Sequence, residues 1–464
     1  MSTAGIQQER VGHLNRRGPR ESGEYVLYWM QASQRAEHNH ALEYAVRQAN
    51  ALGRSLVCVF GLTDGYPEAN LRHYAFMLEG LADVEKGLRR RGIGFAVRRG
   101  SPDEVALEAG RRAALIVTDR GYLRHQVRWR ENVAAEAGCR VTQVESDVVV
   151  PVETASDRRE YAARTFRPRV SRHLERFLVG LGTTALRRPS AGAGLGGVDL
   201  SDPGRVLEEL DLDRGVGPVG HLYRGGTRAA KRLLRRFLEE GLPGYASGRD
   251  QPHAGGVSHM SKYLHFGHIS PLYVALRARG SGAPEEDVGA FLEELVVRRE
   301  LAVNFVRYTP NYDSYSCLPE WARSTLEEHR GDSRERVYTR RQLEEAATHD
   351  PYWNAAMVEM RRTGYLHNHM RMYWGKRILG WTRTPQHAYR TALYLNNRYF
   401  LDGRDPNSYA NVAWVFGLHD RPWKERPVFG KVRYMSRSGL ERKTDPGAYV
   451  RRVERLTGVS ASGV

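Results

Sequence analysis

Tryptophan is concentrated in one stretch of the chain. Four of the eight tryptophans, Trp353, Trp374, Trp381 and Trp414, lie within 62 positions. Trp374 and Trp381 are seven residues apart, so on a helix they share a face and lie about 10 Å apart along the axis. Aromatic rings at that spacing suit stepwise electron transfer. The same spacing also fits core packing, which is the commoner use of periodic apolar positions.

Two further segments carry polar side chains that could bind a ligand. Ser258 and Ser261 precede an apolar stretch and could cap a helix or, more rarely, hold a phosphate at its N-terminus. Glu294 lies in an apolar helical segment, 291–301, where a buried carboxylate needs a partner. Arg298, four residues further on, could pair with it.

The sequence Asp-Gly-Arg-Asp-Pro-Asn at 402–407 combines turn chemistry with two carboxylates. Aspartate and asparagine favour turns because their side chains bond to the nearby backbone. Asp402 and Asp405 could also accept hydrogen bonds from a ligand. The two roles are compatible.

The elements that must position these residues differ along the chain. In the N-terminal third, apolar runs at 25–30, 56–60, 94–97, 114–119 and 140–144 alternate with helical stretches. This order predicts a five-stranded parallel, Rossmann-like sheet covered on both faces, with ligands at the carboxyl ends of its strands. From about residue 227 the periodicity is helical, which predicts an all-α C-terminal domain.

Composition shifts predict four segments. Residues 1–22 are polar and basic without a hydrophobic run, and we expect a disordered tail. Residues 23–150 form the α/β domain. Residues 151–224 mix proline, glycine and charge and are interpreted as an interdomain linker, and 225–464 form the helical domain.

The charge of the chain predicts a polyanionic partner. The net charge is +17 over 464 residues. Such an excess favours nucleic acid over membrane, because no amphipathic basic anchor stands out. A genome whose base composition favours arginine would explain the arginine content, but it explains the net charge less well.

Cysteine usage and hydropathy exclude other classes of protein. Cys58, Cys139 and Cys317 share no metal-ligand spacing, and their scarcity suits a reducing cytoplasm without disulfides. We therefore expect no metal site. No apolar run reaches the roughly 18 residues that a membrane span needs.

Four motifs occur in a characteristic order: Pro-Tyr-Trp-Asn at 351–354, Met-Tyr-Trp-Gly-Lys-Arg at 372–377, Trp-Thr at 381–382, and the turn sequence at 402–407. In this order they resemble class II cyclobutane pyrimidine dimer DNA photolyases. The resemblance extends, more thinly, from about residue 23 to about residue 437.

The resemblance implies a carbon–carbon lyase, a deoxyribodipyrimidine photo-lyase. Photoexcited reduced FAD, held by the helical domain, would pass an electron to a flipped pyrimidine dimer and split it. One alternative is a cryptochrome-like flavin photoreceptor without repair activity. Another is a basic nucleic-acid-binding protein that lacks flavin.

The resemblance also assigns roles to residues. Trp374 would lie nearest the flavin, Trp353 would be the relay, Trp381 the terminus at the surface and Tyr373 an accessory donor. Asn396 would face flavin N5, and Glu294 the dimer. The implied FAD contacts are Tyr245, Val257, Ser258, His259, Met260, Ser261, Leu264, Phe291, Glu294, Arg299, Asn396, Asp402, Asp405 and Asn407. The implied dimer contacts are Arg249, Met372 and Trp414; Arg371, Arg421 and Lys424 are expected phosphate contacts.

Other features implied by the resemblance stay open. The N-terminal domain would hold an antenna chromophore, a deazaflavin or a folate, and the sequence does not choose between them. Other photolyase classes carry tryptophan near position 298, where this chain has Arg298. We expect a monomer that acts on UV-damaged DNA in the cytoplasm, near the nucleoid.

Overall fold

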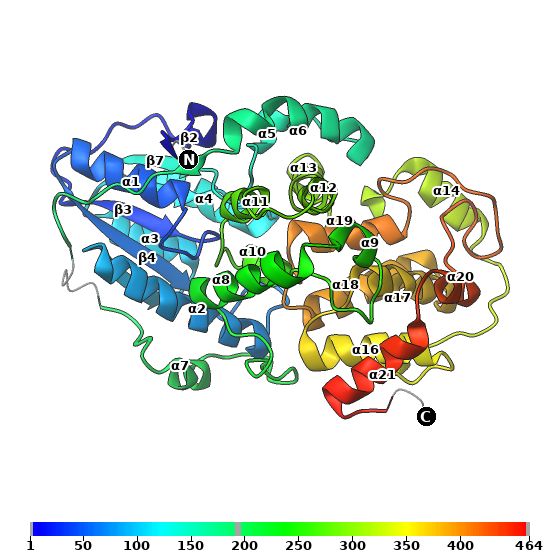
Figure 1. Ribbon diagram of the computed structural model, residues 1–464. Coiled ribbons are helices and arrows are strands. Elements are labelled where there is room, and N and C mark those ends of the chain that lie inside the picture. The colour runs from blue at the N-terminus through cyan, green and yellow to red at the C-terminus, as the bar shows by residue number, and fades with distance from the viewer. Residues whose placement is uncertain (1–2, 191–195, 461–464) are drawn as a thin grey trace.

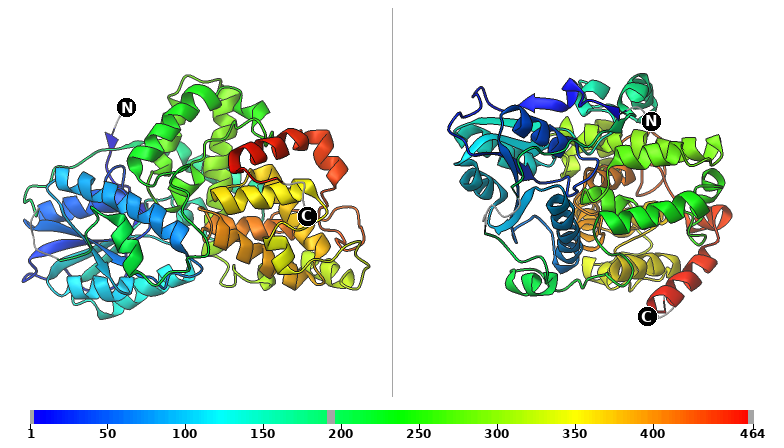
Figure 2. Two further views of the ribbon diagram at one scale, coloured as in Figure 1. Left: turned by 90° about the horizontal axis from the view of Figure 1, so that it is seen from below. Right: turned by 60° about the vertical axis from the view of Figure 1, so that its left-hand side comes forward.

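The chain forms two parts that lie side by side (Figure 1). The computed structural model describes residues 3–190 and 196–460. One part is built on a sheet, and the other holds the helices from α8 onward. Figure 2 shows the same two parts from below and from the side. The predicted fold class, an α/β N-terminal domain with a helical C-terminal domain, is confirmed.

The main sheet has six strands in the order β2-β7-β6-β3-β4-β5. The five predicted strands are present and parallel to their neighbours, and β2 joins them antiparallel to β7. A separate two-stranded sheet pairs β1 with β8. The strands are β1 Thr3–Ala4, β2 Val11–His13, β3 Tyr25–Met30, β4 Ser55–Leu62, β5 Gly94–Arg99, β6 Ala113–Asp119, β7 Arg140–Val144 and β8 Gly180–Leu181.

Helices cover both faces of the main sheet because successive side chains of a strand point to opposite faces. In β3, Val26 and Tyr28 pack with α1 and α2. Leu27 and Trp29 pack on the other face with α3 and α4. These helices are α1 His40–Ala51, α2 Leu71–Arg90, α3 Pro102–Gly110 and α4 Arg124–Glu136.

The prediction of a disordered tail over residues 1–22 is wrong for residues 3–22, while residues 1–2 lie outside the described part. A short helical turn, Gln8–Arg10, leads into β2. The side chain of Arg10 is 2% exposed and donates to the carbonyl oxygens of Glu145, Val148 and Val149. The tail is therefore held by hydrogen bonds of a cation, which an apolar pattern does not reveal.

In the linker of 151–224, α5 and α6 pack against the helical part, and α7 lies against α2 of the sheet part (Figure 1). The predicted helical stretch of the linker is α6, and residues 191–195 lie outside the described ranges. Val198 donates its backbone N–H to Val97 of β5, so the linker also covers that edge of the sheet. Its helices are α5 Val152–Ala155, α6 Ala163–Phe177 and α7 Pro203–Glu209.

The helical part packs around two apolar clusters. Two of its stretches, η2 and η3, are π-helical, a form that is rare and frequent at functional sites. Its elements are α8 Thr227–Arg236, η2 Phe237–Gly241, α9 Tyr245–Gly248, α10 Ser261–His265, α11 Pro271–Arg279, α12 Glu285–Leu292, η3 Glu293–Arg298, α13 Arg299–Arg307, η4 Tyr315–Cys317, α14 Glu320–Glu328, α15 Arg340–Glu344, α16 Pro351–Thr363, α17 Asn368–Trp381, α18 Pro385–Tyr399, α19 Pro406–Val415, α20 Arg437–Lys443 and α21 Pro446–Thr457.

The three cysteines are buried and unpaired. Within residues 3–190 and 196–460, no helix is both long and apolar enough to cross a bilayer. In the same ranges, no three histidine, cysteine or acidic side chains stand close enough to hold a metal ion.

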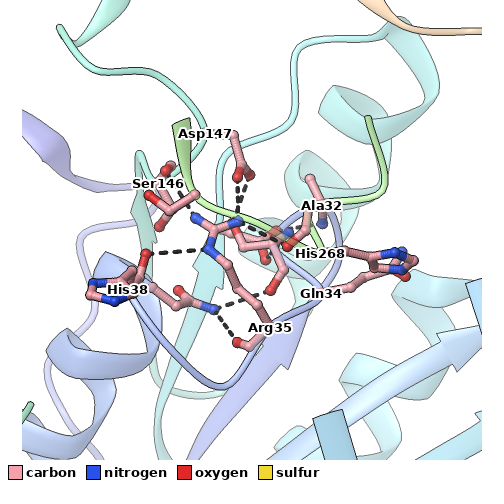
Figure 3. Close-up of polar contacts among 12 residues, drawn as sticks. Ala32, Gln34, Arg35, His38, Ser146, Asp147 and His268 are labelled. Carbon is pink, nitrogen blue, oxygen red and sulfur yellow. Dashed lines mark hydrogen bonds and ion pairs between the residues drawn. The ribbon is translucent and has the colours of Figure 1, made fainter. Parts of the chain in front are cut away.

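Arg35 joins the two parts (Figure 3). Its guanidinium is buried and donates to Asp147, to the carbonyl oxygens of Ser146 and His38, and to the carbonyl oxygen of Gly267, just past α10. The salt bridge to Asp147 measures 2.6 Å. One side chain thus ties the carboxyl ends of the strands to the helical part.

Gly267 makes this approach possible. Its φ is +65°, and a Cβ there would stand 1.8 Å from the carbonyl oxygen of Ala32. Both the left-handed backbone and the contact exclude other residues. The helical part can lie against the β3 loop only with glycine at this position.

We expect Gly267→Ala to lower the free energy of unfolding by about 2–4 kcal/mol, because left-handed strain and overpacking add. Gly255→Ala is the matched control, since Gly255 has φ +71° and nothing within 4 Å of an added Cβ. The control should cost about 1 kcal/mol. Urea unfolding measures both, and equal losses would contradict the role of the Ala32 contact.

Candidate functional site

Three tryptophans form a continuous buried column. Trp374 and Trp381 belong to α17, and Trp353 of α16 packs between them. The indole N–H of Trp353 donates to the carbonyl oxygen of Trp374 at 3.0 Å, and its ring centroid lies 5.7 Å from that of Trp381. All three are at most 4% exposed. The column is part of the core, in which Trp353 contacts the ring of Trp381 and the backbone of Trp374.

Trp381 does not reach the surface, which corrects the prediction that it is the exposed terminus. The side chains of Tyr338 and His349 cover it, with ring centroids 5.5 and 5.3 Å from that of Trp381. Tyr338 is partly exposed and His349 is exposed. Both residues lie outside the motifs, and no sequence signal pointed to them.

Tyr373 is fully buried beside the column. Its phenol donates to the carboxylate of Asp350, and the guanidinium of Arg377 lies 4.9 Å from its ring. Burial and the Asp350 charge raise the pKa of Tyr373 above its usual value. Asp350 also caps α16 by accepting from the backbone of Tyr352 and Trp353, so one carboxylate orients both the helix and the phenol.

A buried salt bridge lies where α18 turns into α19. Arg371 donates to both carboxylate oxygens of Asp402, at 2.9 and 3.0 Å. Burial opposes ionisation of Asp402, but Arg371, the Ser261 hydroxyl and Lys262 outweigh it and lower the pKa of the carboxyl. The Arg371 guanidinium also lies 3.9 Å from the centroid of Phe400. These contacts occupy Arg371, which corrects its prediction as a phosphate contact.

Asp405 fills the capping role, and its role as a ligand contact stays a prediction. One of its oxygens accepts from the backbone and side chain of Asn407, at 2.8 Å each, and so caps α19. The other lies 3.4 Å from His265 of α10. Burial works against ionisation here too, but His265 lowers the pKa of Asp405. Asn396, 3% exposed, faces the same turn from α18 and donates to Asn397.

The segment before α10 differs from the predicted cap. The residue at the N-cap is Met260, not a serine, and no side chain caps the helix. Ser258 accepts from the backbone of Met260, while Ser261 is the first helical residue and reaches Asp402. The serine hydroxyls therefore point at neighbouring polar groups rather than at their own helix.

The remaining expected FAD contacts lie in this same region. Met260, Leu264, Phe291 and Tyr245 belong to one apolar cluster. The ring of Tyr245 lies 5.6 Å from that of Phe291. Val257 precedes the segment, and His259 packs on Tyr365 with centroids 4.5 Å apart.

A cavity opens between the carboxyl edge of the sheet and the helical part. Gln31 and Gln34, which follow β3, line it from the sheet side, and Leu264, Arg299 and Asn407 line it from the other. It lies where ligands of parallel sheets bind. The resemblance implied Leu264, Arg299 and Asn407 on one wall, while Gln31 and Gln34 on the sheet side were not among the predicted contacts.

Several buried polar atoms around this cavity have no hydrogen-bond partner among the described residues. They are Nη1 of Arg299, Nε of Arg404 and both amide atoms of Gln31; near the tryptophan column, the indole nitrogen of Trp374 is also unpaired. Buried polar groups are normally paired. A polar ligand in the cavity could pair these atoms.

The π-helical turn η3 changes which side chains meet. Its wider spacing brings Arg298 to Glu293, five residues before it, at 3.1 Å. Glu294 instead pairs with Arg249 at 2.9 Å. The expected Glu294–Arg298 pair is therefore not formed.

Arg298 lies over Trp414 of α19, with the guanidinium carbon 5.6 Å from the ring centroid. Met372, partly buried on α17, packs against the main cluster of the helical part.

A basic loop with an exposed aromatic ring follows α19. Arg421 and Lys424 are exposed there, and Trp423 is 40% exposed. The guanidinium carbons of Arg421 and Arg433 lie 5.5 and 4.7 Å from the Trp423 ring. Cations around an exposed aromatic side chain fit a nucleic-acid surface. Trp423 was missed, although its place in a basic run was a usable signal.

We expect Arg371→Met to lower the free energy of unfolding by about 3 kcal/mol, because it leaves the Asp402 carboxylate buried without its main partner. The double variant Arg371→Met/Asp402→Asn should recover part of that loss. Urea unfolding of both variants and of Asp402→Asn completes a double-mutant cycle. Additive losses would show that the two side chains do not interact.

Comparison with known proteins gives consistent relatives over nearly the whole chain. A family model for DNA photolyase matches residues 26–190. The deoxyribodipyrimidine photo-lyase of Methanothermobacter thermautotrophicus is 52% identical, over 97% of this chain and 99% of its own length. The protein of the same name from Oryza sativa is 41% identical, over 96% and 90%.

Solved structures share the fold. A class III photolyase from Agrobacterium tumefaciens aligns with a TM-score of 0.72 at 18% identity, covering 93% of this chain and 86% of its own. An archaeal photolyase from Sulfolobus tokodaii, solved with two FAD molecules, gives 0.70 at 18%, covering 95% and 92%. Because the Methanothermobacter and Oryza proteins are 52% and 41% identical over nearly the whole chain, the chain belongs to the DNA photolyase family.

Proposed function

We propose that this protein is a class II cyclobutane pyrimidine dimer photolyase that repairs DNA in light. The observation that carries the proposal is the 52% identity, over 97% of the chain, to a protein named deoxyribodipyrimidine photo-lyase. The motifs at 351–354, 372–377 and 402–407 support the assignment to class II. The division into 23–150, 151–224 and 225–464 is kept, with residues 3–22 added to the first unit.

The residues present fit FAD. Arg299 offers an unpaired N–H, while Asp402 and Asp405 offer partly buried acceptors and Ser261 offers a hydroxyl. These groups suit the phosphates, hydroxyls and imide of a dinucleotide. When bound, FAD would absorb the light and supply the electron that opens the dimer. The residues proposed to hold it are Tyr245, Val257, Ser258, His259, Met260, Ser261, Leu264, Phe291, Glu294, Arg299, Asn396, Asp402, Asp405 and Asn407.

The tryptophan column would carry electrons inward from the surface. Its burial keeps water away from the rings, and the bond from Trp353 to the backbone of Trp374 fixes their relative position. Tyr373, bound to Asp350, is a further donor beside the column. These residues would restore the reduced cofactor rather than touch the dimer.

Another surface would receive the dimer. Glu294 and Arg249 form an exchangeable ion pair that is about one third exposed, so either partner can turn to a pyrimidine edge. Met372 and Trp414 supply apolar contact, and Arg421 and Lys424 supply charge for phosphates. A site of this kind accepts a base that has left the helix, and the net charge of +17 favours approach to DNA.

An antenna chromophore, a deazaflavin or a folate, is proposed to bind on the sheet side of the cavity, against Gln31 and Gln34, whereas Leu264, Arg299 and Asn407 on the other wall are proposed to face FAD. The unpaired groups at Gln31 and Arg404 support a polar heteroaromatic ligand. Because the substrate is DNA, we infer that the protein acts in the cytoplasm near the nucleoid. We propose that it acts as a monomer.

The test is loss of dimers from UV-irradiated oligothymidine, with purified, chemically reduced protein under blue light and a dark control. Repair should occur only in light. Glu294→Ala should slow repair by about tenfold or more, because a charged hydrogen bond to the dimer is lost. A yellow, flavin-loaded protein without repair would indicate a photoreceptor, and a colourless protein without repair a nucleic-acid-binding protein; both outcomes contradict the proposal.

A second test isolates the column. We expect Trp374→Phe to slow photoreduction of the oxidised, flavin-loaded protein by at least about tenfold, since the first ring of the relay is lost. Trp321→Phe, in α14 and outside the column, is the matched control and should behave as the wild type. Equal photoreduction rates in the two variants, followed by absorbance, would remove Trp374 from the relay.

A further inference from the structure

The electron relay does not end at a tryptophan. We propose that Tyr338 supplies the electron that refills oxidised Trp381, and that His349 takes the phenolic proton in the same step. The inference rests on the proposed light-driven function of the column. It identifies the outermost donor and the base that makes its oxidation feasible.

Tyr338 is fixed against the end of the column. Its ring centroid lies 5.5 Å from that of Trp381, nearly edge-on at 76°. Its backbone N–H donates to the carbonyl oxygen of Trp381 at 3.0 Å, so a hydrogen bond sets the approach of the two rings. Trp353 and Tyr338 contact Trp381 at nearly equal centroid distances, 5.7 and 5.5 Å. Tyr338 thus continues the column by one ring.

His349 is placed to accept the proton. The phenolic oxygen of Tyr338 lies 2.7 Å from Nδ1 of His349, and the backbone N–H of His349 donates to that same oxygen at 3.1 Å. In the tautomer that carries its hydrogen on Nε2, His349 accepts the phenolic proton at Nδ1. His349 is exposed, so its other ring nitrogen can exchange protons with water. A phenol without such a base would form a strongly acidic, high-energy cation on oxidation.

Tyr373 lacks this arrangement. Its phenol is bound to Asp350 in the core and is fully buried, so the released proton has no exposed exit beside it. Arg377 lies 4.9 Å from the Tyr373 ring and 5.5 Å from the Trp381 ring. Its charge disfavours a second positive charge on either ring. An electron vacancy on Trp381 is therefore driven outward to Tyr338, where loss of the proton leaves a neutral radical.

The step balances. The oxidant is the indole radical cation of Trp381, produced when the column gives up an electron. Tyr338 loses one electron to Trp381 and its O–H proton to Nδ1, which yields neutral tryptophan, a neutral tyrosyl radical and an imidazolium. A soluble thiol then returns a hydrogen atom to the tyrosyl oxygen, and His349 releases its proton to water.

Transient absorption after a light flash on the oxidised, flavin-loaded protein tests the proposal. In the wild type, the tryptophan radical should convert to a tyrosyl radical, and more slowly in D₂O than in H₂O. Tyr338→Phe should abolish the tyrosyl signal and prolong the tryptophan radical by at least about tenfold. His349→Asn should keep the tyrosine but slow the conversion, because the base is lost. Tyr434→Phe, an exposed tyrosine of the basic loop, is the matched control and should decay as the wild type.

The roles of Tyr338 and His349 can be rejected separately. Unchanged decay in Tyr338→Phe removes Tyr338 from the relay, and wild-type decay in His349→Asn removes His349 as the base. The comparison of D₂O with H₂O uses the wild type alone, so it tests the proton transfer even if a variant folds poorly. Equal conversion rates in the two solvents would exclude proton transfer in this step. Dimer repair by the chemically reduced wild type does not need the tryptophan column. A failure of the proposed repair function can therefore be distinguished from a failure of the Tyr338 proposal.

Discussion

The close approach of Gly267 to Ala32 is the constraint on which the rest of the structure depends. Because no Cβ intervenes, the end of α10 lies against the loop after β3, and Arg35 can span the two parts with one buried guanidinium. The cavity takes one wall from each part. A shift of the helical part by the width of a methyl group would widen that cavity.

Buried charge is the second organising element. Asp402 with Arg371, and Asp350 with Arg377 and Tyr373, bring ions into a core that would otherwise exclude them. Such groups stay buried only when they are paired or bound. The unpaired nitrogens of Arg299 and Trp374 break that rule. Arg299 lies near enough to Asp405 to lower its pKa, which is the arrangement that the proposed binding site would use.

The sequence predicted regular elements well and local chemistry less well. Continuous apolar runs located all five parallel strands, because strands buried on both faces are apolar throughout. The ordered motifs located the tryptophan column and the α18–α19 turn.

Strand β2 was missed because Arg10 holds it through backbone carbonyls. The pairing of Glu294 was missed because a π-helical turn changes the four-residue spacing that the expectation assumed. The burial of Trp381 was missed because its cover comes from residues more than 30 positions away, which no helical period can indicate.

The antiparallel strand β2 has a consequence for how the molecule behaves among its own copies. It occupies the side of β7 that would otherwise present unpaired backbone groups, and the linker residue Val198 does the same at β5. Open strand edges are templates for intermolecular pairing. Arg16 and Arg17 follow β2, so the strand at this margin is short and is flanked by positive charge. The N-terminal segment therefore protects this edge of the sheet from pairing with the sheet of another molecule, which a free tail could not do.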